Sequence, residues 1–109
     1  IVTACASCNS GLGYIYAEMG DEFEAMSAKV MDIFVFLANH GLPEKLEALP
    51  KAKERIKVTY HDPCHLRNQG ITKEPRQILK ALPQVEFVEM PDAGTCWWWR
   101  SSACRQRCS

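Results

Sequence analysis

Three short β-rich segments, separated by helical stretches, are the feature that most constrains how this chain folds. They lie at residues 1–3, 56–60 and 85–90 and are rich in β-branched and other apolar side chains. Strands that are joined through helices pair in parallel, with right-handed crossovers. The sequence therefore predicts an α/β fold, in which helices flank a small parallel sheet of three or four strands in a Rossmann-like layering.

Apolar residues at steps of three and four predict the helices between these strands. A short helix is expected after Asn9 or Ser10, either of which suits its N-cap. A longer helix is expected to begin at Asp21, with Glu24 as its capping-box partner, and to end before Gly41. Its apolar stripe consists of Phe23, Met26, Val30, Ile33, Phe34 and Leu37. Further helices are expected within residues 43–55 and at residues 72–81.

Each predicted strand runs into a loop that carries cysteine. Cys5 and Cys8 follow the first strand, Cys64 the second and Cys96 the third, with 55 residues between Cys8 and Cys64 and 31 between Cys64 and Cys96. In an open parallel sheet, the carboxyl ends of the strands lie along one edge, where such folds bind their ligands. We therefore expect the four thiols to meet there as a metal or cluster site, because thiolates are soft ligands that suit iron–sulfur clusters and zinc.

Two other interpretations of the cysteines stay open. Cys5 and Cys8 form a Cys-x-x-Cys motif between a strand and a helix, as in thioredoxin-like dithiol oxidoreductases, where a helix N-terminus lowers the pKa of the first thiol. Four thiolates also suit a structural zinc site. The six cysteines are too sparse for a small disulfide scaffold, and the chain starts without a secretion signal, so we expect a reducing, cytoplasmic environment.

The neighbours of Cys64 are polar. His61 and His65 flank the thiol, and each suits either a ligand role or capping and polar packing. Asp62 is expected to accept a hydrogen bond from a turn amide rather than to bind a metal. Arg67 suits a solvated loop, or a place where it offsets the negative charge of thiolates. We therefore expect the thiols, rather than these polar side chains, to supply the ligands.

Composition argues against several functions. Charged residues make up 24% of the 109 residues, and 13 Lys and Arg balance 13 Asp and Glu, so no strong field favours a nucleic-acid partner. No apolar run approaches the ~20 residues that cross a bilayer, so we expect at most peripheral association with a membrane. The sequence shows no acid–base pair, phosphate loop or nucleophile triad. We therefore expect no catalytic residue in this chain.

Three stretches of the sequence resemble one known family. They are Thr3-Ala4-Cys5-Ala6-Ser7-Cys8, Tyr60-His61-Asp62-Pro63-Cys64-His65-Leu66-Arg67 and Asp92-Ala93-Gly94-Thr95-Cys96. In this order they resemble the cysteine-rich CCG domain, which occurs in iron–sulfur subunits of glycolate and lactate oxidases, of anaerobic glycerol-3-phosphate dehydrogenase and of heterodisulfide reductase. The resemblance covers residues 1–96, which we expect to form one cysteine-rich α/β domain.

The resemblance implies electron transport. The family holds a [4Fe-4S] cluster, or zinc in some members, and each repeat runs from one Cys through Cys-Cys-Gly to a closing Cys-x-x-Cys. Cys5 and Cys8 then resemble the closing pair of one repeat, Cys64 the first cysteine of the next repeat, and Cys96 the first cysteine of its Cys-Cys-Gly. The implied partners are a flavin-containing dehydrogenase subunit and other iron–sulfur subunits. The implied electron acceptor is a quinone or a disulfide, with the complex at the inner face of the membrane.

The end of the chain departs from the family pattern. Trp97 and Trp98 stand where the family has Cys-Gly, and residues 97–109 contain three Arg and no acidic residue. Glycine suits such a loop because the backbone must approach the sulfur atoms closely, and three consecutive Trp do not. We expect residues 97–109 to be an atypical tail of non-native origin, such as a shifted reading frame, rather than an aromatic, basic nucleic-acid patch.

Overall fold

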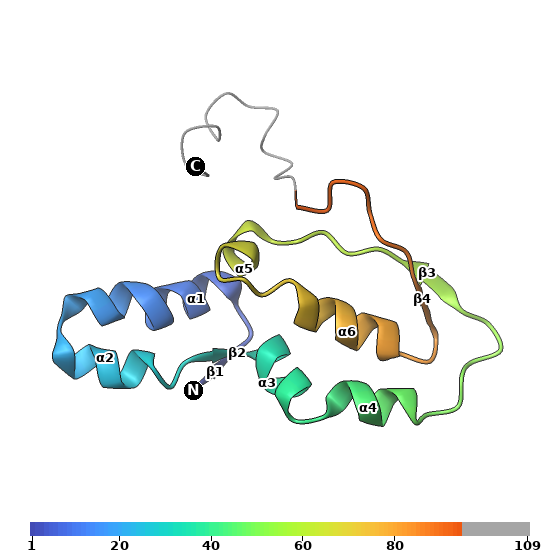
Figure 1. Cartoon of the computed structure of the whole chain (residues 1–109), viewed down its shortest axis with the longest axis horizontal. Helices are drawn as coiled ribbons and strands as arrows, with labels where there is room; N and C mark the ends of the chain where they lie inside the picture. The colour runs from blue at the N-terminus through green and yellow to red at the C-terminus, as the bar shows by residue number, and fades with distance from the viewer. Residues whose placement is uncertain (95–109) are drawn as a thin grey trace.

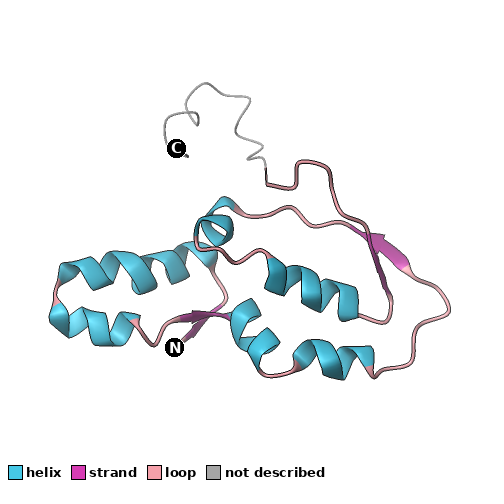
Figure 2. Ribbon diagram, viewed as in Figure 1, coloured by secondary structure: helices cyan, strands magenta, loops and turns pink. Residues whose placement is uncertain are grey.

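The computed structural model describes residues 1–94 as a succession of short helices and strands (Figure 1). Helices make up much more of the ribbon than strands do (Figure 2). Each strand has only two or three residues. The predicted ligand Cys96 and the tail 97–109 lie outside the described residues. The elements are β1 (Val2–Thr3), α1 (Ala6–Ser10), a π-helical turn (Gly11–Ile15), a 3₁₀ turn (Tyr16–Met19), α2 (Asp21–Ser27), β2 (Met31–Asp32), α3 (Ile33–Asn39), α4 (Leu42–Glu47), β3 (Ile56–Val58), α5 (Cys64–Asn68), α6 (Lys73–Ala81) and β4 (Val85–Phe87).

Within residues 1–94 the strands form two separate parallel sheets. β1 pairs with β2, with Val2 opposite Met31, and β3 pairs with β4, with Ile56 opposite Val85. The mixed fold with parallel strands is therefore confirmed. The prediction of a single sheet with three or four strands is wrong for the described residues, because β1 takes β2 as its partner and does not extend the β3–β4 pair. The Rossmann-like layering is not confirmed.

The long helix expected to begin at Asp21 is broken in the middle. α2 ends at Ser27 and α3 begins at Ile33, with β2 between them. The reason is Asp32, which has an extended backbone (φ −68°, ψ 145°) and accepts a hydrogen bond from the Phe34 N–H at 2.8 Å. Asp32 is thus the N-cap of a new helix. The apolar spacing runs on through the break, so periodicity alone misses it.

The other helix ends lie near the predicted positions. The N-cap of α2 is Gly20 rather than Asp21, and its φ of 141° is a conformation that favours glycine. Gly41, with φ 73°, follows α3 and forms the N-cap of α4. α6 ends at Ala81, two residues before Pro83, as the sequence predicts. Glycine and proline therefore mark the helix ends more reliably than the apolar period does.

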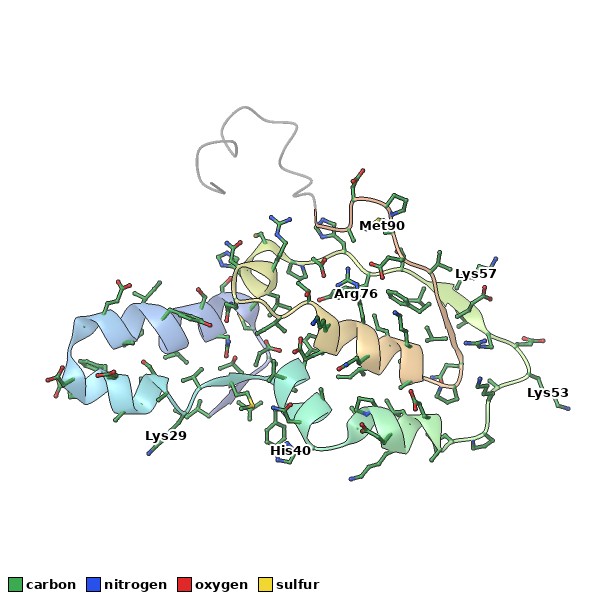
Figure 3. The ribbon with its side chains drawn as sticks, in the orientation of Figure 1. Lys29, His40, Lys53, Lys57, Arg76 and Met90 are labelled. Atoms are coloured by element: carbon green, nitrogen blue, oxygen red, sulfur yellow. The ribbon has the colours of Figure 1, made fainter. Side chains whose placement is uncertain are left out.

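Few apolar side chains are buried among residues 1–94. Those with less than a tenth of their surface exposed are Leu66, Ala81, Val85 and Ala93, together with Pro75. Four polar residues are equally buried and hydrogen-bonded: Asn9, Ser27, Asp32 and Asp62. Many other side chains extend from the ribbon toward the outside (Figure 3). None of the helices described is long and apolar enough to cross a bilayer.

Replacing Asp32 by Ala is expected to lower the free energy of unfolding by about 1–2 kcal/mol, because α3 loses its N-cap. Urea unfolding followed by circular dichroism measures the loss. Asp21→Ala is the matched control, because no side chain caps α2. Equal losses in the two variants would contradict the assignment of Asp32 as the residue that starts α3.

Candidate functional site

The Cys-x-x-Cys motif begins helix α1. Cys5 has an extended backbone and is the N-cap of the helix, and its Sγ accepts a hydrogen bond from the Cys8 N–H at a donor–sulfur distance of 3.4 Å. The expectation that Asn9 or Ser10 caps a helix here is wrong, because the Cys5 thiol occupies the place of the usual Ser or Asp side chain. Both thiols are exposed.

The two thiols of this motif differ in acidity. The hydrogen bond from the Cys8 backbone, with a smaller effect of the Cys8 thiol, lowers the pKa of Cys5. The pKa of Cys8 is raised, first by its thiol hydrogen bond to Cys5 and then by the charge of the Cys5 thiolate. Cys5 is therefore the first of the pair to ionise and the better nucleophile or metal ligand at neutral pH.

Cys64 is the first residue of helix α5. Pro63 precedes it with φ −60° and ψ 134°, the extended conformation from which the helix starts. Cys64 is half-buried, whereas Leu66, two residues further along the helix, is buried and anchors it. The loop before Cys64 is fixed by the Asp62 N–H, which donates to the Ala93 carbonyl at 2.9 Å.

Helices α1 and α5 pack against each other (Figure 1), and the Gln69 side chain joins them. The Gln69 Nε2 donates to the Ala6 carbonyl at 3.1 Å and to the His65 carbonyl at 2.7 Å, and its Oε1 accepts from the Asn9 Nδ2 at 2.6 Å. Asn9 in turn accepts from the Thr3 hydroxyl at 2.8 Å. This amide junction connects the segment of Cys5 and Cys8 to the helix that carries Cys64.

The described residues do not bring the predicted thiol ligands Cys5, Cys8 and Cys64 together as a metal site. Among residues 1–94, no three His, Cys, Asp or Glu side chains are grouped so that they could hold a metal ion. Three of the four predicted ligands, Cys5, Cys8 and Cys64, lie on the two helices that the amide junction joins. Their role as ligands stays a prediction, and Cys96 lies beyond the described residues.

Arg67 lies beside the end of the described chain. A β-carbon on Gly94 would come within 3.0 Å of the Arg67 Nη1, so glycine leaves room for the guanidinium there. Arg67 is on α5, three residues after Cys64, and Gly94 is two residues before Cys96 in the sequence. The positive charge of Arg67 thus lies next to the segment that precedes Cys96 in the sequence.

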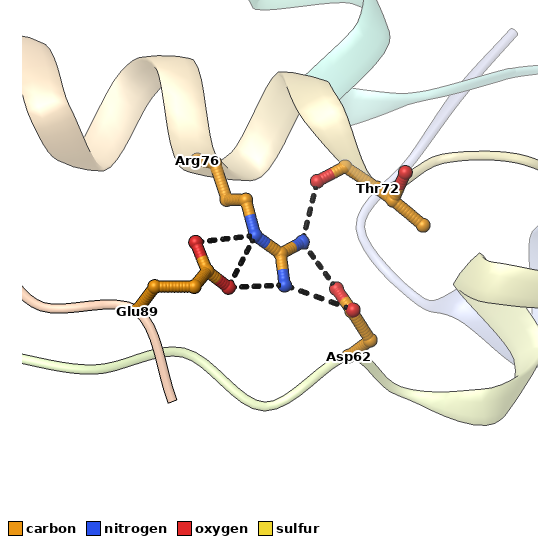
Figure 4. Close-up of polar contacts among 4 residues, drawn as sticks. All are labelled: Asp62, Thr72, Arg76 and Glu89. Carbon is orange, nitrogen blue, oxygen red and sulfur yellow. Dashed lines mark hydrogen bonds and ion pairs between the residues drawn. The ribbon is translucent and has the colours of Figure 1, made fainter. Parts of the chain in front are cut away.

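An ion-pair cluster near Cys64 was not predicted from the sequence. The Arg76 Nη1 and Nη2 donate to the two carboxylate oxygens of Asp62 at 2.6 and 2.9 Å, and the Arg76 Nε donates to Glu89 at 2.9 Å (Figure 4). The expectation that Asp62 accepts from a turn amide misses this partner. No short motif signals the contact, because Arg76 is 14 residues from Asp62 and 13 from Glu89. These contacts raise the pKa of Arg76 above its ordinary value, with the Asp62 hydrogen bond as the largest cause.

Comparison with known proteins assigns part of the chain to a family. Residues 58–96 match the family model described as a cysteine-rich domain, CCG. Over these residues, the chain belongs to the CCG cysteine-rich domain family, and the resemblance found in the sequence is confirmed. No solved structure matches the chain significantly.

Similar proteins are components of oxidoreductases. The chain is 41% identical over 97 residues to one subunit of the CoM/CoB fumarate reductase of Methanothermobacter marburgensis, and the match covers 88% of this chain and 18% of that protein. It is 48% identical over 58 residues (45% of this chain, 14% of the relative) to one subunit of the dihydromethanophenazine:CoB–CoM heterodisulfide reductase of Methanosarcina acetivorans. It is 55% identical over 40 residues (36% and 9%) to the probable glycolate oxidase iron–sulfur subunit of Bacillus subtilis. The chain thus spans less than a fifth of the length of these relatives.

Replacing Gln69 by Leu is expected to lower the free energy of unfolding by about 1–3 kcal/mol, because the buried Asn9 amide loses its acceptor. Urea unfolding measures the loss. Gln77→Leu is the matched control, because Gln77 is exposed on α6. A loss no greater than that of Gln77→Leu would show that the amide junction does not stabilise the contact between α1 and α5.

Cys5 is expected to react with iodoacetamide faster than Cys8 in the metal-free chain at neutral pH, because a larger fraction of Cys5 is thiolate. As pH rises, the rate at Cys5 reaches its plateau at a lower pH than the rate at Cys8. Peptide mass spectrometry after timed alkylation measures both rates. The difference should vanish in urea, where α1 is lost, and a faster reaction at Cys8 in the folded chain would contradict the assigned geometry.

Proposed function

We propose that residues 1–96 form a cysteine-rich domain that binds an iron–sulfur cluster of the [4Fe-4S] type and transfers electrons within a multi-subunit oxidoreductase. The observation that carries the proposal is the amide junction. It joins the Cys5–Cys8 segment to the Cys64 helix, although 55 residues separate Cys8 from Cys64 in the sequence. The family of residues 58–96 and the iron–sulfur names of similar proteins support it.

In this proposal the chain supplies ligands and a polar setting rather than a reaction of its own. Cys5, Cys8, Cys64 and Cys96 are the ligands that this chain supplies, the first two to the cluster of one family repeat and the last two to that of the next, and a bound cluster would take up and release single electrons. The Cys8 N–H stabilises the Cys5 thiolate, which favours its deprotonated, metal-binding form. The guanidinium of Arg67 offsets part of the negative charge that thiolates bring to this end of the molecule.

The partners follow from the class of relatives. We infer that a flavin-containing dehydrogenase subunit and other iron–sulfur subunits of the same complex exchange electrons with this domain, and that a quinone or a disulfide is the final acceptor. A heterodisulfide reductase subunit and the iron–sulfur subunit of a menaquinol oxidoreductase are among the relatives, and these names support a disulfide and a quinone as the candidate acceptors. We place the complex in the cytoplasm, associated with the inner face of the membrane through the partner subunits.

One observation favours a second function. Cys5 is exposed and has a lowered pKa, as the attacking thiol of a dithiol oxidoreductase requires. An insulin-reduction assay on the metal-free chain tests this function, with Cys5→Ser as the control. Reduction that depends on Cys5 would favour the dithiol function over electron transfer through a cluster. Elemental analysis of the purified chain separates iron from the zinc of a structural thiolate site.

The ligand assignment predicts which cysteines matter for iron uptake. After anaerobic reconstitution with iron and sulfide, the wild-type chain is expected to bind less than one full cluster, because the family divides these cysteines between two repeats. Cys5→Ser, Cys8→Ser, Cys64→Ser and Cys96→Ser should each lower the bound iron further. Iron and sulfide analysis, with visible absorption, measures the uptake.

The chain offers matched controls for this experiment. Cys104 and Cys108 lie in the tail outside the predicted ligand set, so Cys104→Ser and Cys108→Ser should retain the wild-type iron content. A full and stable cluster that survives Cys64→Ala would contradict the assignment of Cys64 as a ligand. Zinc in place of iron in the purified protein would favour the structural zinc site.

A further inference from the structure

We propose that Arg76 is a positioning residue, which locks the loop that carries Cys64 to the segment that follows β4. The lock consists of Arg76, Asp62 and Glu89 (Figure 4). Its effect on a cluster rests on the function proposed above, whereas the lock itself rests on contacts between described residues. Arg76 touches none of the cysteines in these contacts and acts through the two acids.

Every donor of the Arg76 guanidinium is used. One edge faces Asp62, with Nη1 at 2.6 Å from Oδ1 and Nη2 at 2.9 Å from Oδ2, and Nη1 also donates to the Thr72 carbonyl at 2.7 Å. The other edge faces Glu89, with Nε at 2.9 and 3.2 Å from its two oxygens and Nη2 at 2.9 Å from Oε1. A planar fork with five donors is required to hold both carboxylates at once, and Lys has no such geometry.

The lock joins three separate parts of the chain. Asp62 is two residues before Cys64, Arg76 is on α6, and Glu89 follows β4 on the way to Cys96. The backbone adds a second link between the same loops, because the Asp62 N–H donates to the Ala93 carbonyl at 2.9 Å. Arg76 therefore holds the loop before Cys64 to the described segment between β4 and Gly94.

Burial and charge make Arg76 hard to replace. The Arg76 side chain is 16% exposed and that of Asp62 only 9%, whereas Glu89 is 51% exposed. The Tyr60 ring covers the guanidinium, with Cζ at 5.5 Å from the ring centroid. Without Arg76, two carboxylates remain, and that of Asp62 is buried without its cation. The loops are then expected to separate at Asp62.

The test measures hydrogen exchange at the Asp62 amide in the full, metal-free chain. Arg76→Met is expected to accelerate this exchange about tenfold relative to wild type, because the Asp62 loop opens more often. The Met31 amide, which donates to the Ile1 carbonyl at 2.8 Å in the other sheet, serves as the internal reference. Arg76→Lys keeps the charge but not the fork, so it should restore only part of the protection.

Two matched controls separate the effect of breaking the lock from the general effect of removing an arginine or a glutamate. Arg55→Met removes an arginine that donates to the Val85 carbonyl at the start of β4, away from the lock. Glu86→Ala removes an exposed acid from β4, in contrast to Glu89→Ala, which releases one side of Arg76. Glu89→Ala leaves the buried Arg76–Asp62 pair in place but releases the segment after β4, which includes Ala93, the acceptor of the Asp62 N–H, so exchange at the Asp62 amide should still accelerate. It therefore tests the lock even if Arg76→Met fails to fold.

The second measurement is the electron paramagnetic resonance spectrum of the reduced, reconstituted chain. The iron content per chain is measured on the same samples. A spectrum that changes in Arg76→Met and Glu89→Ala, but not in Arg55→Met and Glu86→Ala, supports the positioning role. Two outcomes would overturn the positioning role of Arg76. One is equal acceleration of exchange at the Asp62 and Met31 amides in Arg76→Met, and the other is unchanged exchange at Asp62 in Glu89→Ala. A wild-type chain that takes up no iron refutes the proposed function, and the amide exchange still decides whether the lock exists.

Discussion

The contact between α1 and α5 depends on one buried amide junction. Gln69 reaches from the end of α5 to the Ala6 carbonyl and to Asn9, and Asn9 is only 6% exposed. A buried amide without a partner costs about 1–3 kcal/mol, so the junction is specific for this register of the two helices. The positions of Cys5, Cys8 and Cys64 relative to one another depend on this register.

A second polar contact organises the other half of the described chain. Arg76 joins the loop before Cys64 to the segment after β4, where the β3–β4 sheet has only three residues in each strand. Since few apolar side chains are buried, polar groups determine how the loops are placed. Buried polar contacts are directional, which suits a site where thiolates must be held in a defined geometry. The family of residues 58–96 and the iron–sulfur names of similar proteins agree with such a site.

Some of the fold could be predicted from the sequence because it depends on local chemistry. Gly41 and Pro83 mark the ends of helices because their backbones allow few alternatives. The parallel pairing of strands follows from the helices between them. The break at Asp32 was missed because an apolar spacing of three and four continues through it, and the hydrogen bond to the Phe34 N–H overrides that spacing.

The sequence by itself determined the chemical type of the candidate site: thiols at the ends of β-segments, beside helix starts, in motifs that one family shares. It also determined the parallel direction of the strands, because chain connections impose it. Only the tertiary structure decided that β1 pairs with β2, that Gln69 joins α1 to α5, and that Arg76 binds both Asp62 and Glu89. The physical reason is that these contacts connect residues 13 to 63 positions apart, and their partners are chosen by burial and hydrogen-bond geometry rather than by local spacing.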